Sequence, residues 1–413
     1  MGAGSPTASP PEPTRAASAP GRVWIDARGD APWRVAGGIS LVTRLVRSLE
    51  LEGAGEITIV CDAPRAPSSI GARGSDTRVD CVVLAPGAPL ACILGPEGGL
   101  AIDGALVIDR RLLRAILAAA EPCLVAPPSG ETRVVLARIG PAEASRFGAP
   151  LAPQERLPLL LPERLPTFSD EMRGETPILY LAARSPEAAK AAERALVRAT
   201  QKHVMDAPAR WIDPPIENAL VTRLAPTRIT PNQVTIACTL LGFIAAWLLW
   251  HGIFALALPL MYLVGWLDGV DGKLARLRLH YSPLGAGESY FDFAYENAWW
   301  IALTAHLAGA GHADAVAWGA ALVGGNLLDE IAYTLGHARL GVALDLLSAA
   351  DGAFRLVAGR RNIYAAMLLV ATLVGSPYAG LVAMGAWAVV TGVVHALRLA
   401  FALRAPARGG LAA

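Results

Sequence analysis

The second half of this 413-residue chain is a succession of apolar segments separated by short polar stretches. A helix that crosses a bilayer needs roughly 20 predominantly apolar residues, and helix ends that pack on neighbouring helices can complete shorter segments. The segments are Val234–Trp250, Ile253–Leu267, Phe291–Ala308, Ala313–Leu328, Ile363–Val374 and Ala379–Ala402. They predict an all-α bundle of six transmembrane helices. The alternative is a set of buried helices in a large soluble domain.

Basic residues recur at every second junction between these segments. They are Arg223 and Arg228, then Arg276 and Arg278, then Arg355, Arg360 and Arg361, and finally Arg404 and Arg408. The loops near 251–252, 309–312 and 375–378 carry no Lys or Arg. Because positive loops stay inside, we expect a multi-pass protein of the cytoplasmic membrane with both termini in the cytoplasm. The net charge of +1 gives no reason to expect a nucleic-acid partner.

The first half of the chain has a different composition. Residues 1–21 are rich in Pro, Ala and Ser, which predicts a disordered tail. From 22 to 206, short strand-like runs alternate with helical patterns, which predicts a Rossmann-like α/β domain. The strand-like runs are Val23–Ile25, Glu56–Val60, Val79–Leu84, Arg133–Ala137 and Ile178–Leu181, and the helical patterns are Ser40–Leu51 and Arg110–Ala120. The helical bundle would then occupy residues 207–408.

Two acidic pairs lie at the edges of the second and third apolar segments. Asp268 and Asp271 end the second segment, and Asp292 and Glu296 stand near the start of the third. Carboxylates beside membrane helices are costly and normally functional, and spacings of three and four residues place each pair on one helical face. Two converging pairs would form an oxygen-rich site for a divalent cation, next to a glycine and an arginine suited to phosphate.

The stretch from Asp268 to Arg276 resembles the signature of the CDP-alcohol phosphatidyltransferase family. That signature is D-x-x-D-G-x-x-A-R, a spacer, and G-x-x-x-D-x-x-x-D. Its first half is matched by Asp268, Asp271, Gly272, Ala275 and Arg276. The run 227–235 also looks like this family's approach to its helical domain, so the resemblance covers about 212–404.

The second half of the signature departs in its spacing. A lengthened spacer aligns Asp292 and Glu296 with the family's last two aspartates. We favour this alignment because Phe291 precedes Asp292, as an aromatic or aliphatic residue does in relatives. The alternative alignment uses Glu288 and Asp292.

The resemblance implies an integral-membrane phosphotransferase that moves a phospho-alcohol group from a CDP-linked donor to an alcohol or alcohol phosphate and releases CMP, in phospholipid or polar-lipid synthesis. It implies one or two Mg²⁺ or Mn²⁺ ions held by Asp268, Asp271, Asp292 and Glu296. Glu296 would also be the base that takes the proton of the acceptor hydroxyl. Membrane lipids are expected partners, and a homodimer is left open.

The resemblance also implies sites for the two substrates. Gly272, Ala275 and Arg276 would contact the CDP phosphates. The acceptor-binding candidates are Arg355, Arg360, Arg361, Asp329 and Glu330.

The segment 23–60 looks like the opening of the sugar-phosphate nucleotidyltransferases. It retains Gly29 of the glycine-rich loop, has Arg34 near the place of the expected lysine, and is followed by Asp109 near the place of a metal-binding aspartate. We favour a degenerate domain. The alternatives are a bifunctional enzyme that also makes its donor from CTP, as in inositol-phosphate cytidylyltransferase fusions, and a non-catalytic membrane pseudoenzyme.

Overall fold

The computed structural model describes residues 22–64, 77–85, 88–93, 98–153 and 155–404. The chain divides into two compact units. An α/β unit contains the residues up to Thr167 together with Pro177–Ala195, and a helical unit contains Phe168–Thr176 together with the residues from Leu196 onward. This confirms the predicted fold class of an α/β domain followed by a helical domain.

A seven-stranded sheet forms the centre of the α/β unit. In spatial order its strands are β10 (Leu159–Leu160), β8 (Cys123–Val125), β9 (Leu136–Ile139), β6 (Gly99–Asp103), β1 (Val23–Asp26), β4 (Glu56–Cys61) and β5 (Arg78–Val83). Strand β1 is parallel to both β4 and β6, and β9 is antiparallel to β6. Val23, Trp24 and Ile25 are each at most 1% exposed, as expected for a strand covered on both faces.

Two amphipathic helices pack on this sheet. Helix α1 (Leu41–Leu51) begins after Ser40, whose side chain accepts the N–H of Thr43, and α2 (Arg110–Leu117) begins after Asp109. Their apolar faces join the β-strand side chains in one core. The strand predicted at 178–181 forms as β13 (Tyr180–Ala182), but it pairs with β7 (Leu106–Ile108) in a small separate sheet.

The helical unit contains the predicted apolar helices. They and their short companions are α4 (Ala207–Trp211), α5 (Asp213–Leu224), α6 (Pro231–Trp250), α7 (Phe254–Arg278), α8 (Pro283–Ala286), α9 (Glu288–Gly309), α10 (Ala315–Leu340), α11 (Ala349–Arg355), α12 (Arg361–Leu373) and α13 (Pro377–Arg404). Among the described helices, α6, α7 and α13 are long and apolar enough to cross a membrane. This agrees with a membrane-associated protein, whereas the count of six spans stays a prediction.

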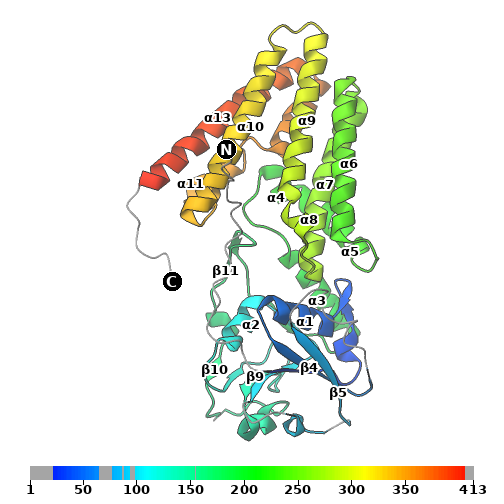
Figure 1. Cartoon of the computed structure of the whole chain (residues 1–413), viewed down its shortest axis with the longest axis vertical. Helices are drawn as coiled ribbons and strands as arrows, with labels where there is room; N and C mark the ends of the chain where they lie inside the picture. The colour runs from blue at the N-terminus through cyan, green and yellow to red at the C-terminus, as the bar shows by residue number, and fades with distance from the viewer. Residues whose placement is uncertain (1–21, 65–76, 86–87, 94–97, 154, 405–413) are drawn as a thin grey trace, which may run out of the picture. The chain divides into compact units, whose positions relative to one another are not determined.

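The long helices approach closely where glycine removes a side chain. Helix α6 packs on α7 and α9, and α10 packs along α13, as Figure 1 shows. A Cβ on Gly242 of α6 would lie 2.6 Å from Cγ of Tyr295, and one on Gly325 of α10 would lie 2.4 Å from the carbonyl carbon of Ala388. These positions need glycine because nearly all real Cβ atoms keep a larger distance from their neighbours.

Helix α7 continues past its apolar part into the acidic stretch, as predicted. Its last turn carries Arg278, whose guanidinium donates to the carbonyls of Leu224, Ala225, Thr227 and Ile229. These bonds satisfy carbonyls at the end of α5 and in the loop that follows it. The polar end of α7 is thereby attached to the end of α5 and to the loop that leads to α6.

Candidate active site

The carboxylates of α7 lie on one face, at the polar end of the helix. The side chain of Asp271 is 2% exposed and accepts two hydrogen bonds, from Thr235 Oγ1 of α6 at 2.7 Å and from the backbone N–H of Gly272 at 2.6 Å. Asp268 lies one turn earlier on the same face. Contacts from two helices therefore fix the orientation of the Asp271 carboxylate.

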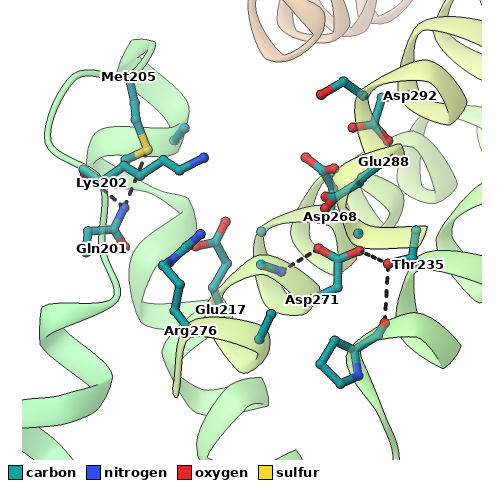
Figure 2. Close-up of a pocket in the computed structure, with 18 of the residues that line it drawn as sticks. Gln201, Lys202, Met205, Glu217, Thr235, Asp268, Asp271, Arg276, Glu288 and Asp292 are labelled. Atoms are coloured by element: carbon teal, nitrogen blue, oxygen red, sulfur yellow. Dashed lines mark hydrogen bonds between the residues drawn. The ribbon is translucent and has the colours of Figure 1, made fainter. Parts of the chain in front are cut away.

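Helix α9 brings a third carboxylate to this face. The short helix α8 is capped by Ser282, which also donates to Asn232 at the start of α6 at 2.6 Å, and α9 then begins at Glu288. One carboxylate oxygen from each of Asp268, Asp271 and Glu288 lies within 4.8 Å of the others. Oxygen atoms at this spacing suit a hard divalent cation such as Mg²⁺, and Figure 2 shows the three side chains together.

The two acids favoured by the sequence lie farther along α9. Asp292 is one turn beyond Glu288 and is close enough to hydrogen bond with Asp268. Glu296, a further turn along, pairs with Arg361 Nη1 at 3.2 Å. Glu288 thus joins Asp268 and Asp271 in the group of acids, and the metal and base roles expected of Asp292 and Glu296 stay predictions.

Arg361, the first residue of α12, occupies the inner end of the site. Its guanidinium bonds to Asp268 through Nη2 and to the hydroxyl of Tyr295 through Nη1 at 2.5 Å, in addition to Glu296. Burying a carboxylate without a cation is costly. Arg361 supplies that charge to Asp268 and Glu296.

The acids open into a cavity of about 600 Å³ within the helical unit. Gly272, Ala275 and Arg276 line it, together with Asp268, Asp271, Glu288 and Asp292. The Nε of Arg276 donates to the carbonyl of Thr200 at 3.1 Å, and a Cβ on Gly272 would lie 3.2 Å from Nη1 of Arg276. The structure thus brings together the predicted phosphate-contacting residues and the α7 acids.

The acceptor-binding candidates divide into two groups. Arg355 and Arg361 line the cavity. Arg360 instead pairs with Asp329 at 3.4 Å and lies over the ring of Tyr333 at 4.4 Å, while Glu330 is exposed. Within the described residues, the cavity wall does not include Arg360, Asp329 or Glu330.

Asp329 takes part in a separate buried network. It also pairs with His395 of α13, and neither side chain is more than 7% exposed. Asp329 lies on α10, His395 on α13 and Arg360 just before α12. Their ion pairs therefore join these three helices, and the network does not face the cavity.

The sequence analysis missed several cavity residues that come from other parts of the chain. Thr235 orients Asp271 from α6, and Lys202 and Arg173 lie upstream of the bundle. Arg173 and Lys202 are 95 and 66 residues before Asp268, and no spacing pattern connects them to the acidic stretch. Only the fold brings them together.

Two neighbouring parallel strands of the α/β unit end in aspartates. Asp26 of β1 and Asp103 of β6 are partners in register. Strand β4 lies on one side of β1 and β6 on the other, so the strand order reverses at β1. Ligands of α/β sheets bind at the carboxyl ends of the strands where the order reverses. Arg28 pairs with Asp26 at 2.7 Å, and Arg184 pairs with Asp103 at 2.6 Å. Internal cations therefore neutralise both carboxylates.

The predicted nucleotidyltransferase-like residues have local partners. Gly29 has a left-handed φ of 74° and donates its N–H to Asp62 at 3.0 Å. The guanidinium of Arg34 donates to the carbonyl of Arg184. Asp109 caps α2 and pairs with Arg111 at 2.8 Å. In the main sheet, the acid at the carboxyl end of β6 is Asp103, six residues before Asp109.

Comparisons with known proteins give relatives for part of the chain. A protein of Rubrobacter xylanophilus named "bifunctional IPC transferase and DIPP synthase" is 35% identical over 182 residues, which is 44% of this chain and 38% of the relative. Proteins of the same name from Thermococcus kodakarensis and Aquifex aeolicus are 34% and 31% identical over 125 and 122 residues. These matches cover 30% and 28% of this chain and 28% of each relative. No family model matches the chain.

The names of these relatives describe two activities in one protein. They bear out the resemblance of this chain to a CDP-alcohol phosphatidyltransferase-like domain joined to a nucleotidyltransferase-like domain. A solved structure, HddC from Yersinia pseudotuberculosis, aligns with 42% of this chain and 98% of its own length. This alignment has 12% sequence identity and a TM-score of 0.30.

Proposed function

We propose that this chain is a membrane-embedded transferase that moves a phospho-alcohol group from a CDP-linked donor to an acceptor alcohol and releases CMP. The observation that carries the proposal is the convergence of Asp268, Asp271 and Glu288 in a cavity that Arg276 also lines. The names of the relatives support a transferase. The matches cover at most 38% of a relative's length.

We propose Asp268, Asp271 and Glu288 as the residues that hold one or two Mg²⁺ or Mn²⁺ ions. Their oxygen atoms fit such an ion in number, charge and spacing. When bound, a divalent cation would neutralise the donor diphosphate and the oxygen that leaves with CMP. Arg276 would pair with phosphate oxygens, and Gly272 would leave room beside the backbone for them.

The base is proposed to lie on α9. It would take the proton of the acceptor hydroxyl while the hydroxyl oxygen bonds to phosphorus and the bond from phosphorus to the CMP oxygen breaks. Asp292 lines the cavity, whereas Glu296 is paired with Arg361. This favours the Glu288 and Asp292 alignment, and Glu296 as the base remains the competing prediction.

Asp271→Asn tests the proposed function. The substitution keeps the size of the side chain but removes a charge from the proposed metal site, so we expect CMP release to fall by about 10²-fold or more. The assay uses the purified full chain in lipid with a panel of CDP-linked donors and alcohols, with and without a chelator. Asp314→Asn, the same change at an exposed position just before α10, is the matched control. Near-normal turnover by Asp271→Asn, or full turnover in excess chelator, would rule out this site.

A second candidate function is synthesis of the donor from CTP by the α/β unit. The two-activity names of the relatives favour it. We nevertheless propose that this unit is degenerate, because Arg184 pairs with both Asp103 at 2.6 Å and Glu131 at 2.8 Å at the edge of the sheet. A fixed guanidinium at this position competes with a metal ion for the same carboxylates. Pyrophosphate release from CTP and a phosphorylated alcohol by the full chain would establish the bifunctional alternative instead.

A further inference from the structure

The cavity has a second wall, opposite the acids, built from two segments upstream of the bundle. One is the hairpin of β11 (Phe168–Ser169) and β12 (Gly174–Glu175), and the other is the connector 200–206 that follows α3 (Pro186–Ala199). Both segments belong to the helical unit. They place Arg173 and Lys202 on the cavity lining. Figure 2 shows the side chain of Lys202 extending toward the acids of α7 and α9.

Contacts between the two segments hold this wall together. The N–H of His203 donates to the carbonyl of Met172 at 2.8 Å. A Cβ on Gly174 would lie 2.7 Å from Cβ of His203, so the backbone of the hairpin touches the side chain of His203. Arg173 has a left-handed φ of 53°, which is uncommon for a residue with a side chain and persists where the surrounding structure imposes it.

Lys202 is a half-buried cation of this wall, and Glu171 and Asp206 of the same two segments line the cavity as well. Among the described residues, no carboxylate forms an ion pair with Lys202 or Arg276, and Asp268 and Glu288 act on Lys202 only from farther away. Arg173 has one acidic partner, Asp345, at 3.8 Å. Burial, and then the charges of Arg276 and Arg173, lower the pKa of Lys202 to about 8. Clustering like charges in a cavity is costly unless an anion joins them.

We propose that Lys202, together with Arg173, binds a phosphate group of a substrate across the cavity from the acidic residues. This inference rests on the proposed function, because it assumes that Asp268, Asp271 and Glu288 are occupied by divalent cation during turnover. Under that condition the acids no longer compete for the ammonium group. Lys202 is then free to bind phosphate oxygens, for which an ammonium group is well suited.

Two sources offer this chemistry: the diphosphate of the CDP-linked donor and a phosphate carried by the acceptor. Both place phosphate oxygens beside the reacting centre. The substrate whose affinity depends on Lys202 shows which of the two phosphate groups the lysine binds. The measurement therefore needs one arm for each substrate.

The test compares Lys202→Met with Lys202→Arg in the full chain. Lys202→Met keeps the length of the side chain without the charge, and Lys190→Met, an exposed change in the α/β unit, is the control. The first arm measures the Kd of CDP in the presence of Mn²⁺ and the KM of the CDP-linked donor. The second arm measures the KM of glycerol 3-phosphate against that of unphosphorylated glycerol.

We expect Lys202→Met to weaken one of the phosphate-bearing ligands by about 10- to 100-fold, which is typical for loss of a charged hydrogen bond. Lys202→Arg should restore most of the loss, and kcat should change less than KM. Arg173→Met should weaken the same ligand. A rise in the Kd of CDP identifies the donor, and a rise in the KM of glycerol 3-phosphate alone identifies the acceptor.

The inference would be overturned if folded Lys202→Met had the same Kd for CDP and the same KM for glycerol 3-phosphate as Lys190→Met. That result leaves the proposed function intact if Asp271→Asn is inactive. Conversely, normal activity of Asp271→Asn would rule out the proposed metal site. The Kd of CDP for Lys202→Met would still show whether Lys202 contacts a phosphate group. The two failures are therefore distinguishable.

Discussion

Arg361 determines which acids of α9 are available to a ligand. Its guanidinium lies between Asp268 and Glu296 and also contacts Tyr295. A charged hydrogen bond of this kind favours an ionised, firmly oriented carboxylate. Glu296 is paired with Arg361, whereas Glu288 and Asp292 are on the cavity lining.

Two isosteric substitutions decide between the alignments of α9. If Glu288 is a metal ligand, Glu288→Gln should raise the Mn²⁺ concentration needed for half-maximal turnover by about 10-fold or more. Glu296→Gln should change that concentration little and should lower thermal stability, because it removes a charge from the half-buried pair with Arg361. The measurements are metal titrations of CMP release and thermal unfolding of each variant. The opposite pattern, with Glu296→Gln folded but turning over about 10²-fold more slowly, would restore Glu296 as the base.

At the scale of elements, ion pairs join segments that are distant in sequence. Lys273 of α7 pairs with Glu217 of α5 at 2.8 Å, and both side chains are at most 8% exposed. In the α/β unit, Arg184 follows β13 and joins Asp103 of β6 to Glu131 in the loop before β9. Breaking a buried pair leaves an uncompensated charge, so each pair makes its elements depend on one another.

The network around Glu131 predicts acid sensitivity of the α/β unit. Hydrogen bonds from Arg133, and further from Arg184, lower the pKa of Glu131 from 4.5 to about 2. The folded pKa is below the unfolded one, so this contribution to stability is complete above pH 4.5 and is lost as the pH falls toward 2. Hydrogen exchange in β6 and β9 of the full chain, corrected for intrinsic rates, should accelerate over this range.

Glu131→Gln is the matched variant for this prediction. It should exchange faster than the natural chain at pH 6 and should show a smaller change between pH 4.5 and 2. If both proteins have the same pH dependence, Glu131 does not couple these strands.

At the scale of the whole molecule, the chain joins a polar α/β unit to a helical unit with membrane-length helices. Helices α6, α7 and α13 are long and apolar enough to cross a bilayer. Helices α9 and α10, of 22 and 26 residues, have the length but carry acidic residues within it. Such residues are tolerated in a membrane when they face other helices, as Asp329 does through its buried pair with His395.

Labelling of single cysteines tests the proposed topology of six spans with a cytoplasmic active site. The positive-inside rule places the loop at His312 outside the cytoplasm and the tail at Arg408 within it. His312→Cys and Arg408→Cys, in a chain without its natural cysteines, should react with an impermeant reagent from opposite sides. Labelling of both from the same side would contradict the six-span arrangement.

The sequence alone determined the class of the fold and half of the candidate site. Periodicity and length of the apolar runs are local properties, so they predicted the helices, and the continuation of α7 through Asp268 and Asp271 follows from unbroken helical spacing. Motif spacing also placed Gly272 and Arg276 beside these acids. None of this information depends on distant parts of the chain.

Only the tertiary structure decided which residues meet the acids of α7. Helix α9, which follows α8 and packs through Tyr295 against Gly242, brings Glu288 to Asp268 and Asp271. Lys202 and Arg173 reach the cavity because a connector and a hairpin fold against the bundle. Such contacts join residues that share no periodicity, and they form because packing and charge neutralisation are optimised over the whole unit.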